Sequence, residues 1–128
     1  MTDNINILKM ASAMARHAEE RHRLLAENIA NADTANYRAK DLEPFEEAYS
    51  RFSDRNGVTQ DVLDTPDGKP IWRVETAAAP GALSPNGNSV SIEDQMMRSV
   101  EAQEEHQAAL MIYKKAIDIM RISLGRGA

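Results

Sequence analysis

Apolar residues recur at steps of three and four over about residues 5–31, which is the spacing that predicts an amphipathic helix. The pattern resembles a heptad seam, and because half of its members are alanine, a partner helix can approach closely. Asn28, Asn31 and the run 32–34 lower helix propensity and are expected to end this helix. The stripe comprises Leu8, Ala11, Ala15, Ala18, His22, Leu25, Ile29 and Ala32.

A second, longer helix is predicted over about residues 91–124. Ser91 is a suitable N-cap with Asp94 three residues later, and Gly125 is a natural stop. Acidic side chains dominate its first half and basic side chains its second half, an order that complements the helix dipole. Its seam comprises Met96, Val100, Gln103, Gln107, Leu110, Tyr113, Ile117, Met120 and Leu124.

The middle of the chain, residues 38–90, has a different character, because it holds all five prolines and four of the six glycines. A short helix from Pro44 to Phe52 and a short strand from Ile71 to Thr76 are the regular elements expected there. We leave the conformation of residues 50–85 open, either disordered in the free monomer or ordered by a neighbouring subunit. A small cluster is expected among Tyr49, Phe52, Trp72 and Val74.

Together these segments predict an all-α fold in which the two long terminal helices form an antiparallel, coiled-coil-like hairpin. Residues 1–37 form the N-terminal part, residues 38–90 the loop-rich middle and residues 91–128 the C-terminal part of one assembly domain. The two helices present more apolar stripe than one partner helix covers, and the middle is not expected to supply a third layer. The surplus is therefore predicted to meet other copies or other subunits.

Composition narrows the possible partners. The net charge of −5 argues against general nucleic-acid binding, which requires a basic excess. The chain has no cysteine, so disulfides, thiolate metal sites and cysteine nucleophiles are excluded. We find no cleavable secretory signal and no apolar run of membrane-spanning length. Direct membrane insertion is not expected, and the mixed charges on the C-terminal helix argue against binding flat on a bilayer.

A metal or catalytic site is not predicted. His17 and His22 are five residues apart, so they do not share one helix face as a zincin pair would. Glu19-x-x-His22 has the spacing of a di-iron bundle, but the second helix offers Gln103-x-x-His106 in place of a matching pair. No nucleophile elbow or glycine-rich phosphate loop is present. We therefore expect no enzyme activity, no cofactor and no metal ligands, and we interpret these polar residues as solvated.

Two motifs resemble the flagellar rod and hook proteins. Residues 25–39, LAENIANADTANYRA, are similar to the family pattern A-x-N-I-A-N-x-x-T-P-G-Y, and the segment Gly87-Asn88-Ser89-Val90 is similar to the one that opens the C-terminal helix in proximal rod subunits. The short length and small middle favour the FlgB type over the FlgC type, which stays the alternative within the family. The matching residues of the first motif are Ala26, Asn28, Ile29, Ala30, Asn31, Thr34 and Tyr37.

The chain departs from the family pattern at several positions. Ala35-Asn36 stands where the family has Pro-Gly, and because asparagine tolerates the left-handed conformation, the turn is expected to survive. Gln95 stands where an acidic residue is common, and Ala102 and His106 stand where asparagine and an aromatic residue are common.

The resemblance implies a structural subunit of the basal-body rod that polymerises by helix packing, transmits torque from the membrane ring toward the hook and is required for motility. It implies export without a cleaved signal through the flagellar type III apparatus, and a final place in the rod within the periplasm. The implied partners are other copies, other rod subunits and a membrane-ring adaptor. We expect the assembly interface to include Leu8, Ala15, Leu25, Asn28, Ile29, Asn31, Thr34, Tyr37, Val100, Leu110, Tyr113, Ile117, Met120 and Leu124.

The residues alone leave two other functions open. A free-standing helical adaptor or export chaperone would bind one partner helix in a groove and would be a stable monomer or dimer. A metal-binding helical bundle would retain stoichiometric iron or zinc on purification. The rod subunit instead predicts a chain that orders fully only in the polymer.

Overall fold

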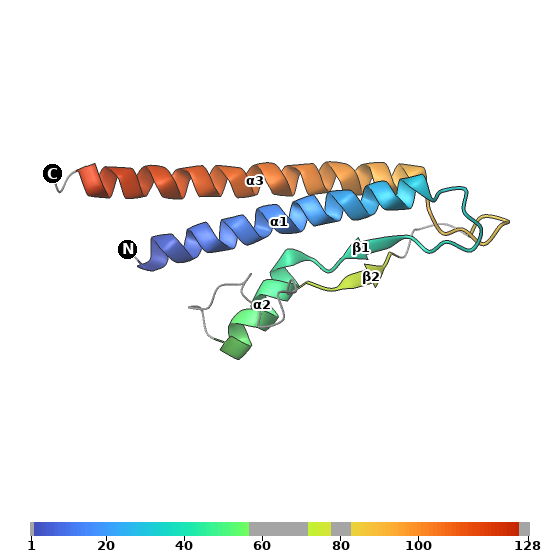
Figure 1. Ribbon diagram of the computed structural model, residues 1–128, viewed down its shortest axis with the longest axis horizontal. Coiled ribbons are helices and arrows are strands. Elements are labelled where there is room, and N and C mark those ends of the chain that lie inside the picture. The colour runs from blue at the N-terminus through green and yellow to red at the C-terminus, as the bar shows by residue number, and fades with distance from the viewer. Residues whose placement is uncertain (1, 57–71, 78–82, 126–128) are drawn as a thin grey trace.

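The computed structural model describes residues 2–56, 72–77 and 83–125. The two long helices are α1, Thr2–Ala30, and α3, Ile92–Gly125. They lie side by side and run in opposite directions along the length of the molecule, as Figure 1 shows. The predicted all-α hairpin is therefore confirmed. No helix in these ranges is long and apolar enough to cross a bilayer.

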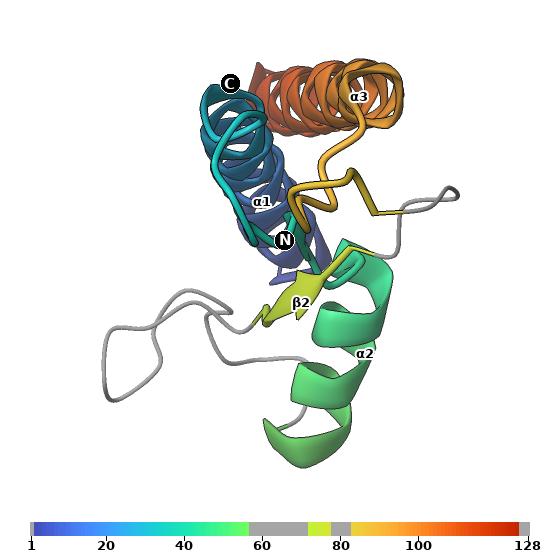
Figure 2. The same ribbon diagram turned by 90° about the vertical axis from the view of Figure 1, so that its right-hand side faces the viewer.

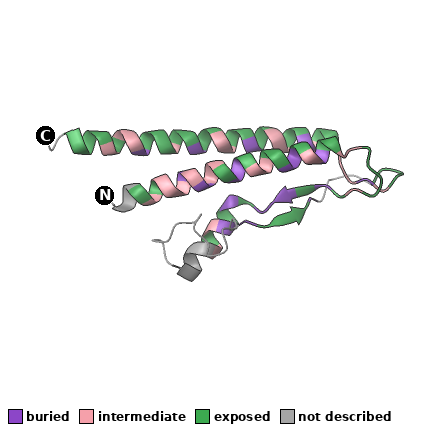
Figure 3. Cartoon of the chain, in the orientation of Figure 1, coloured by how far each residue is buried: buried purple, intermediate pink, exposed green. Residues whose placement is uncertain are grey.

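Small side chains line the contact between α1 and α3. The buried residues of α3 are Gln95, Ala102, Ala109 and Ala116, spaced seven apart, and the buried Ala11, Ala18 and Leu25 of α1 have the same spacing. Buried positions recur along both long helices in Figure 3. We call this line of residues the alanine seam. The larger apolar residues predicted as the seam of α3 lie mostly on its exposed side, and the side chain of Leu110 is 50% exposed. The predicted face of α3 was therefore displaced around the helix.

The middle of the chain forms a layer against a side of α1 that α3 leaves free, and it lies below the two long helices in Figure 2. Strands β1, Lys40–Leu42, and β2, Val74–Thr76, pair antiparallel with Asp41 opposite Glu75. Helix α2, Phe45–Asn56, follows β1 directly. The expectation that the middle supplies no third layer was wrong, because the apolar side of this segment packs on the face of α1 that α3 leaves free.

The main apolar core lies between α1 and this layer. Ala13 and Leu24 of α1 pack with buried residues of the middle segment, and Met10, Met14 and Tyr49 complete the cluster. The predicted contribution of Trp72 and Tyr49 is confirmed. Val74 was wrongly assigned to the cluster, since it lies on the outer strand and is 59% exposed, and the side chain of Phe52 lies outside the described residues. The middle segment contributes Leu42, Phe45, Ala48 and Trp72.

The ends of the predicted elements agree closely with the structure. Ser91 caps α3 by accepting a hydrogen bond from the backbone N–H of Asp94 onto its Oγ, at 3.3 Å. Strand β2 falls within the predicted strand, whereas helix α2 begins near the predicted start but continues past the predicted end at Phe52 to Asn56. Strand β1 was missed, and much of the segment 50–85, namely residues 57–71 and 78–82, lies outside the described residues.

Candidate functional site

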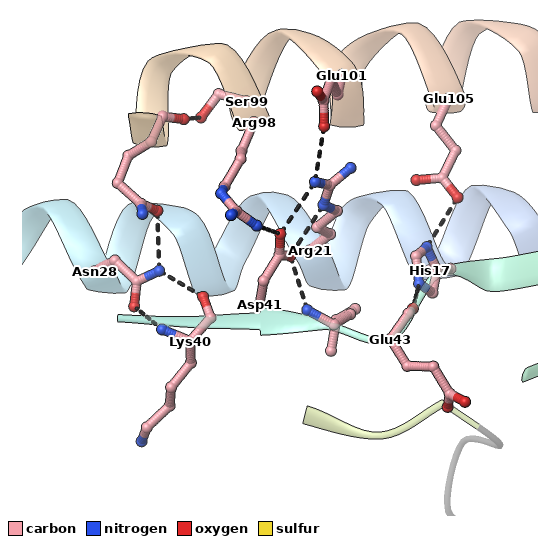
Figure 4. Close-up of polar contacts among 12 residues, drawn as sticks. His17, Arg21, Asn28, Lys40, Asp41, Glu43, Arg98, Ser99, Glu101 and Glu105 are labelled. Atoms are coloured by element: carbon pink, nitrogen blue, oxygen red, sulfur yellow. Dashed lines mark hydrogen bonds and ion pairs between the residues drawn. The ribbon is translucent and has the colours of Figure 1, made fainter. Parts of the chain in front are cut away.

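A polar junction joins the end of α1 to the start of α3, and Asn28 is its centre. Its side chain is fully buried. The Asn28 Nδ2 donates to the backbone oxygen of Lys40 at 2.6 Å and to Oε1 of Gln95 at 2.9 Å. Its Oδ1 accepts from the Lys40 backbone N–H at 3.0 Å and from the Tyr37 hydroxyl at 3.2 Å. One side chain thus holds α1, β1 and α3 together, as Figure 4 shows for its contacts with Lys40 and α3.

A second asparagine, Asn88, ties the loop before α3 to the end of α1. Its Nδ2 donates to the backbone oxygens of Asn31, at 2.7 Å, and Thr34, at 2.6 Å. These oxygens lie just past the last turn of α1, where helical partners are missing. The Asn88 Oδ1 accepts from the backbone N–H of Val90 at 2.7 Å. The two motifs that resemble rod proteins are therefore bonded directly to each other within one chain.

Two left-handed residues make the close approach of these loops possible. Asn36 has a φ of 60° and Gly87 a φ of 80°. The expected left-handed turn at Asn36 is confirmed. A Cβ at Gly87 would collide with the Asn36 side chain, so glycine is required there by both conformation and space.

Gln95 is buried at the start of α3 and has an incomplete set of partners. Its Oε1 accepts from Asn28, but its Nε2 has no hydrogen-bond partner in the described part of the chain. This is the position where the family pattern has an acidic residue. A carboxylate there would accept from Asn28 and would leave no unpaired donor.

The carboxylate of Asp41 forms an ionic hub between all three layers. It accepts two hydrogen bonds from Arg21 of α1, at 2.9 and 3.0 Å, and one from Arg98 of α3, at 2.7 Å (Figure 4). Burial opposes ionisation of Asp41, but the hydrogen bonds from Arg21 and Arg98 outweigh it and hold the pKa of this carboxyl below its ordinary value. The hub therefore consists of a charged carboxylate clamped by two guanidinium groups.

His17 forms a further tie between the layers, although the sequence had indicated a solvated residue. Its ring is only 2% exposed and packs edge-on against Phe45 and Trp72. Nδ1 lies 2.9 Å from Oε1 of Glu105 on α3, and Nε2 lies 2.7 Å from the backbone oxygen of Glu43. His17 therefore links α1 both to α3 and to the segment that follows β1.

The neighbouring Glu43 is also fixed in place. Hydrogen bonds from the Arg51 guanidinium lower the pKa of Glu43 against the opposing effect of burial, with the Arg73 backbone N–H adding to the effect. Across residues 2–56, 72–77 and 83–125, no cluster of three or more His, Cys, Asp or Glu side chains is arranged to hold a metal ion.

The outer side of α3 is the principal apolar surface that the described chain leaves open. A shallow groove of about 270 Å³ continues this surface toward the first turns of α1, lined by Ile7 together with α3 residues including Met111, Ile112 and Ile119. The exposed apolar residues of α3 fall in two stretches, 92–100 and 110–124, and exposed apolar patches of this kind mark interaction surfaces. The exposed apolar residues of α3 are Ile92, Met96, Met97, Val100, Leu110, Met111, Tyr113, Ile119, Ile122 and Leu124.

Comparison with known proteins bears on these features. No protein-family model matches the chain. Flagellar basal body rod protein FlgB of Agrobacterium fabrum (strain C58) is 25% identical to it over 137 aligned positions, covering 95% of this chain and 95% of that protein. The chain resembles the FlgB-like rod proteins. The similarity extends across the middle segment as well, where the two motifs alone gave no information.

The residues predicted for a FlgB-like assembly interface fall into three groups. Leu25 and Asn28 are fully buried by the chain's own elements, so their contacts are internal. The half-buried group is Leu8, Ala15, Asn31, Tyr37, Ile117 and Met120. The exposed group, which a neighbour can reach, is Ile29, Thr34, Val100, Leu110, Tyr113 and Leu124.

Several residues that build the site were not identified from the sequence. The ionic hub gave no local signal in the sequence, because its residues are far apart in the chain. Arg21 is 20 positions from Asp41, and Arg98 is 57 positions from it. The buried amide of Asn88 lies within the second FlgB-like motif, so its importance was indicated but its partners were not. His17 was considered only as a metal ligand or a solvated residue.

Proposed function

We propose that this protein is a non-enzymatic structural subunit of the bacterial flagellar basal-body rod. The observation that carries the proposal is the set of apolar side chains that the hairpin leaves exposed on α3, in the stretches 92–100 and 110–124. Similarity to a FlgB protein over nearly the whole chain supports the rod as the assembly in which that surface is used. The buried junction and hub support the same function, because they fix the direction in which α3 presents its face.

In this proposal the subunit occupies the proximal rod within the periplasm. It is made in the cytoplasm, exported by the type III apparatus without a cleaved signal, and contacts other copies, other rod subunits and a membrane-ring adaptor. Torque passes from the ring toward the hook through many simultaneous helix contacts, which requires no chemistry and no cofactor. Motility depends on the subunit because the rod is continuous. It does not bind nucleic acid or insert into the bilayer.

The test is an aspartate substitution on the exposed side of α3. Leu110→Asp places a charge at a half-exposed position, so the subunit still folds but the surface no longer packs against an apolar neighbour. Leu25→Asp would not serve, because Leu25 is buried and its loss would unfold the subunit. The matched control is Val74→Asp, which is exposed to a similar extent but lies on β2 in the other layer.

Each variant is expressed in a strain derived from a motile parent by deletion of the endogenous gene. Leu110→Asp should abolish swimming and be absent from isolated basal bodies while export continues, and Val74→Asp should behave like the unmodified chain. Normal swimming of the Leu110→Asp strain would contradict the interface. An unmodified chain that stays in the cytoplasm and never enters basal bodies would instead indicate an adaptor or export chaperone.

A further inference from the structure

The first turns of α3, at the junction end of the hairpin in Figure 1, carry a stripe of exposed side chains. It consists of Glu93, Met97 and Val100, and steps of four and three keep these residues on one side of the helix. Met97 is 67% exposed and Val100 is 55% exposed. Within the described part of the chain, Glu93 forms no ion pair. We call these three residues the head stripe.

The last turns of α3, at the opposite end of the hairpin, carry a second stripe with the same spacing. It consists of Lys115, Ile119 and Ile122, all of them exposed. Lys115 and Ile119 also line the apolar groove that reaches Ile7 of α1. We call these three residues the tail stripe. Each of its members lies 22 positions after the corresponding member of the head stripe, so the two stripes are separate surfaces.

We propose that the head stripe of one copy of this chain packs on the tail stripe of a second copy, with the two α3 helices parallel and offset by 22 residues. This inference rests on the proposed function and specifies one contact between subunits. At this offset the acidic Glu93 lies level with the basic Lys115. The apolar pairs that lie level are Met97 with Ile119 and Val100 with Ile122.

The same contact can be made at both ends of each copy without crowding. One neighbour lies along residues 92–103 of α3 and the other along residues 114–125, so the two neighbours cover different parts of the helix. The offset is about 33 Å at 1.5 Å per residue. Because each copy is displaced along the helix axis from the one before, the array does not close, and a heterologous contact of this kind generates a filament.

The charges of α3 favour contact between unlike ends. Residues 92–105 carry five acidic side chains and one basic side chain, whereas residues 111–124 carry three basic and one acidic. A head-to-head contact would therefore bring Glu93 of both copies together, and a tail-to-tail contact would bring Lys115 of both together, which is repulsive. At the proposed offset no two like charges lie level, because Asp118, the one acid of the tail end, lies level with Met96.

An antiparallel pair of copies is the alternative that uses both stripes. It would place the head stripe of each copy on the tail stripe of the other and would close as a symmetric dimer. The unmodified chain then stops at two copies, whereas the parallel contact continues to larger species. The size of the assembly in solution separates the two arrangements.

The test blocks one stripe at a time in the purified full-length chain. Met97→Asp blocks the head stripe and Ile119→Asp blocks the tail stripe, and both side chains are more than half exposed, so the helical circular dichroism should be unchanged. Each variant alone should be monomeric in sedimentation velocity at its highest soluble concentration. An equimolar mixture should form a dimer that grows no further, because it joins the one intact head stripe to the one intact tail stripe. As the control, Val74→Asp added to the Ile119→Asp variant should leave the mixed dimer unchanged.

The charge pair is tested in the same mixture. Lys115→Glu added to the Met97→Asp variant should weaken the mixed dimer about fivefold, the upper range for an exposed ion pair, and Glu93→Lys added to its partner should restore it.

Dimers of Ile119→Asp alone or of Met97→Asp alone would show contact between like ends and overturn the proposal. A mixture that stays monomeric, or an unmodified chain that stops at a dimer, would overturn it too. A chain that enters basal bodies without forming the mixed dimer refutes this contact only. A mixed dimer from a chain that is absent from basal bodies refutes the rod only.

Discussion

Replacing Asn28 by alanine should separate the internal role of the rod-like motif from its role in assembly. The substitution removes four hydrogen bonds from a fully buried side chain, two to the backbone of Lys40 and one each to Tyr37 and Gln95. At a net contribution of about 1 kcal/mol each, the loss is about 4 kcal/mol. That is a large part of the roughly 5–15 kcal/mol by which domains are stable, so we expect a chain that is partly unfolded near physiological temperature.

The matched control is Asn31→Ala, the same change three residues later in the motif. Within the described part of the chain, the Asn31 side chain forms two hydrogen bonds, to the nearby Glu27 and Thr34, so its removal should cost about 2 kcal/mol or less, half of the loss at Asn28. Urea unfolding followed by helical circular dichroism and by the fluorescence of Trp72, the single tryptophan, measures both variants. If Asn28→Ala were no less stable than Asn31→Ala, the buried junction would not hold the fold. A Tyr37→Phe double-mutant cycle then isolates the Asn28–Tyr37 bond.

Three further changes test the ionic hub and the left-handed turn. Because the pKa of Asp41 is lowered in the fold, this carboxylate stabilises the folded chain above about pH 4, the ordinary range for a free carboxyl, and the stabilisation is lost as pH falls through the folded-state pKa. The urea midpoints of Asp41→Asn and of the unmodified chain should therefore converge in acid. A difference between the two midpoints that does not change with pH would contradict the hub. Gly87→Ala should lower the free energy of unfolding by at least about 1–2 kcal/mol. Gly125→Ala, where an added Cβ meets no atom, should leave the free energy of unfolding unchanged in both thermal and urea unfolding. Asn36→Gly should stay within about 0.5 kcal/mol of the unmodified chain, whereas Asn36→Val should be clearly less stable because its φ of 60° excludes a branched side chain.

The sequence predicted the elements better than the faces they use. Helices α1 and α3 were predictable because their signals are local, such as the Ser91 cap and Gly125. The side of α3 that faces α1 was not identified, because large apolar residues occur on several sides of this helix. The contact with α1 is made by alanines spaced seven apart, and alanine contributes little to a hydrophobic pattern. Strand β1 escaped notice because it has three residues, two of them charged.

The site was predictable only where a motif indicated it. Asn28 and Asn88 lie in segments that resemble rod proteins, but nothing local showed that the two segments bond to each other. Arg21, Asp41 and Arg98 come from three elements that meet only after folding. Such long-range partners leave no periodic or positional trace in a single sequence.

The alanine seam gives the hairpin two ends of unequal mechanical character. Alanine surfaces interdigitate only slightly, so the seam alone resists sliding of α1 along α3 weakly. The bonds that oppose such shear lie in the half of the hairpin next to the junction, between residues 17–28 of α1 and 95–105 of α3. Axial strain would therefore be borne at that end, while the first turns of α1 and the last turns of α3 yield first. The hairpin therefore has one end at which α1 and α3 are held together by polar bonds and one end at which they can shift, and exposed apolar residues of α3 occur at both.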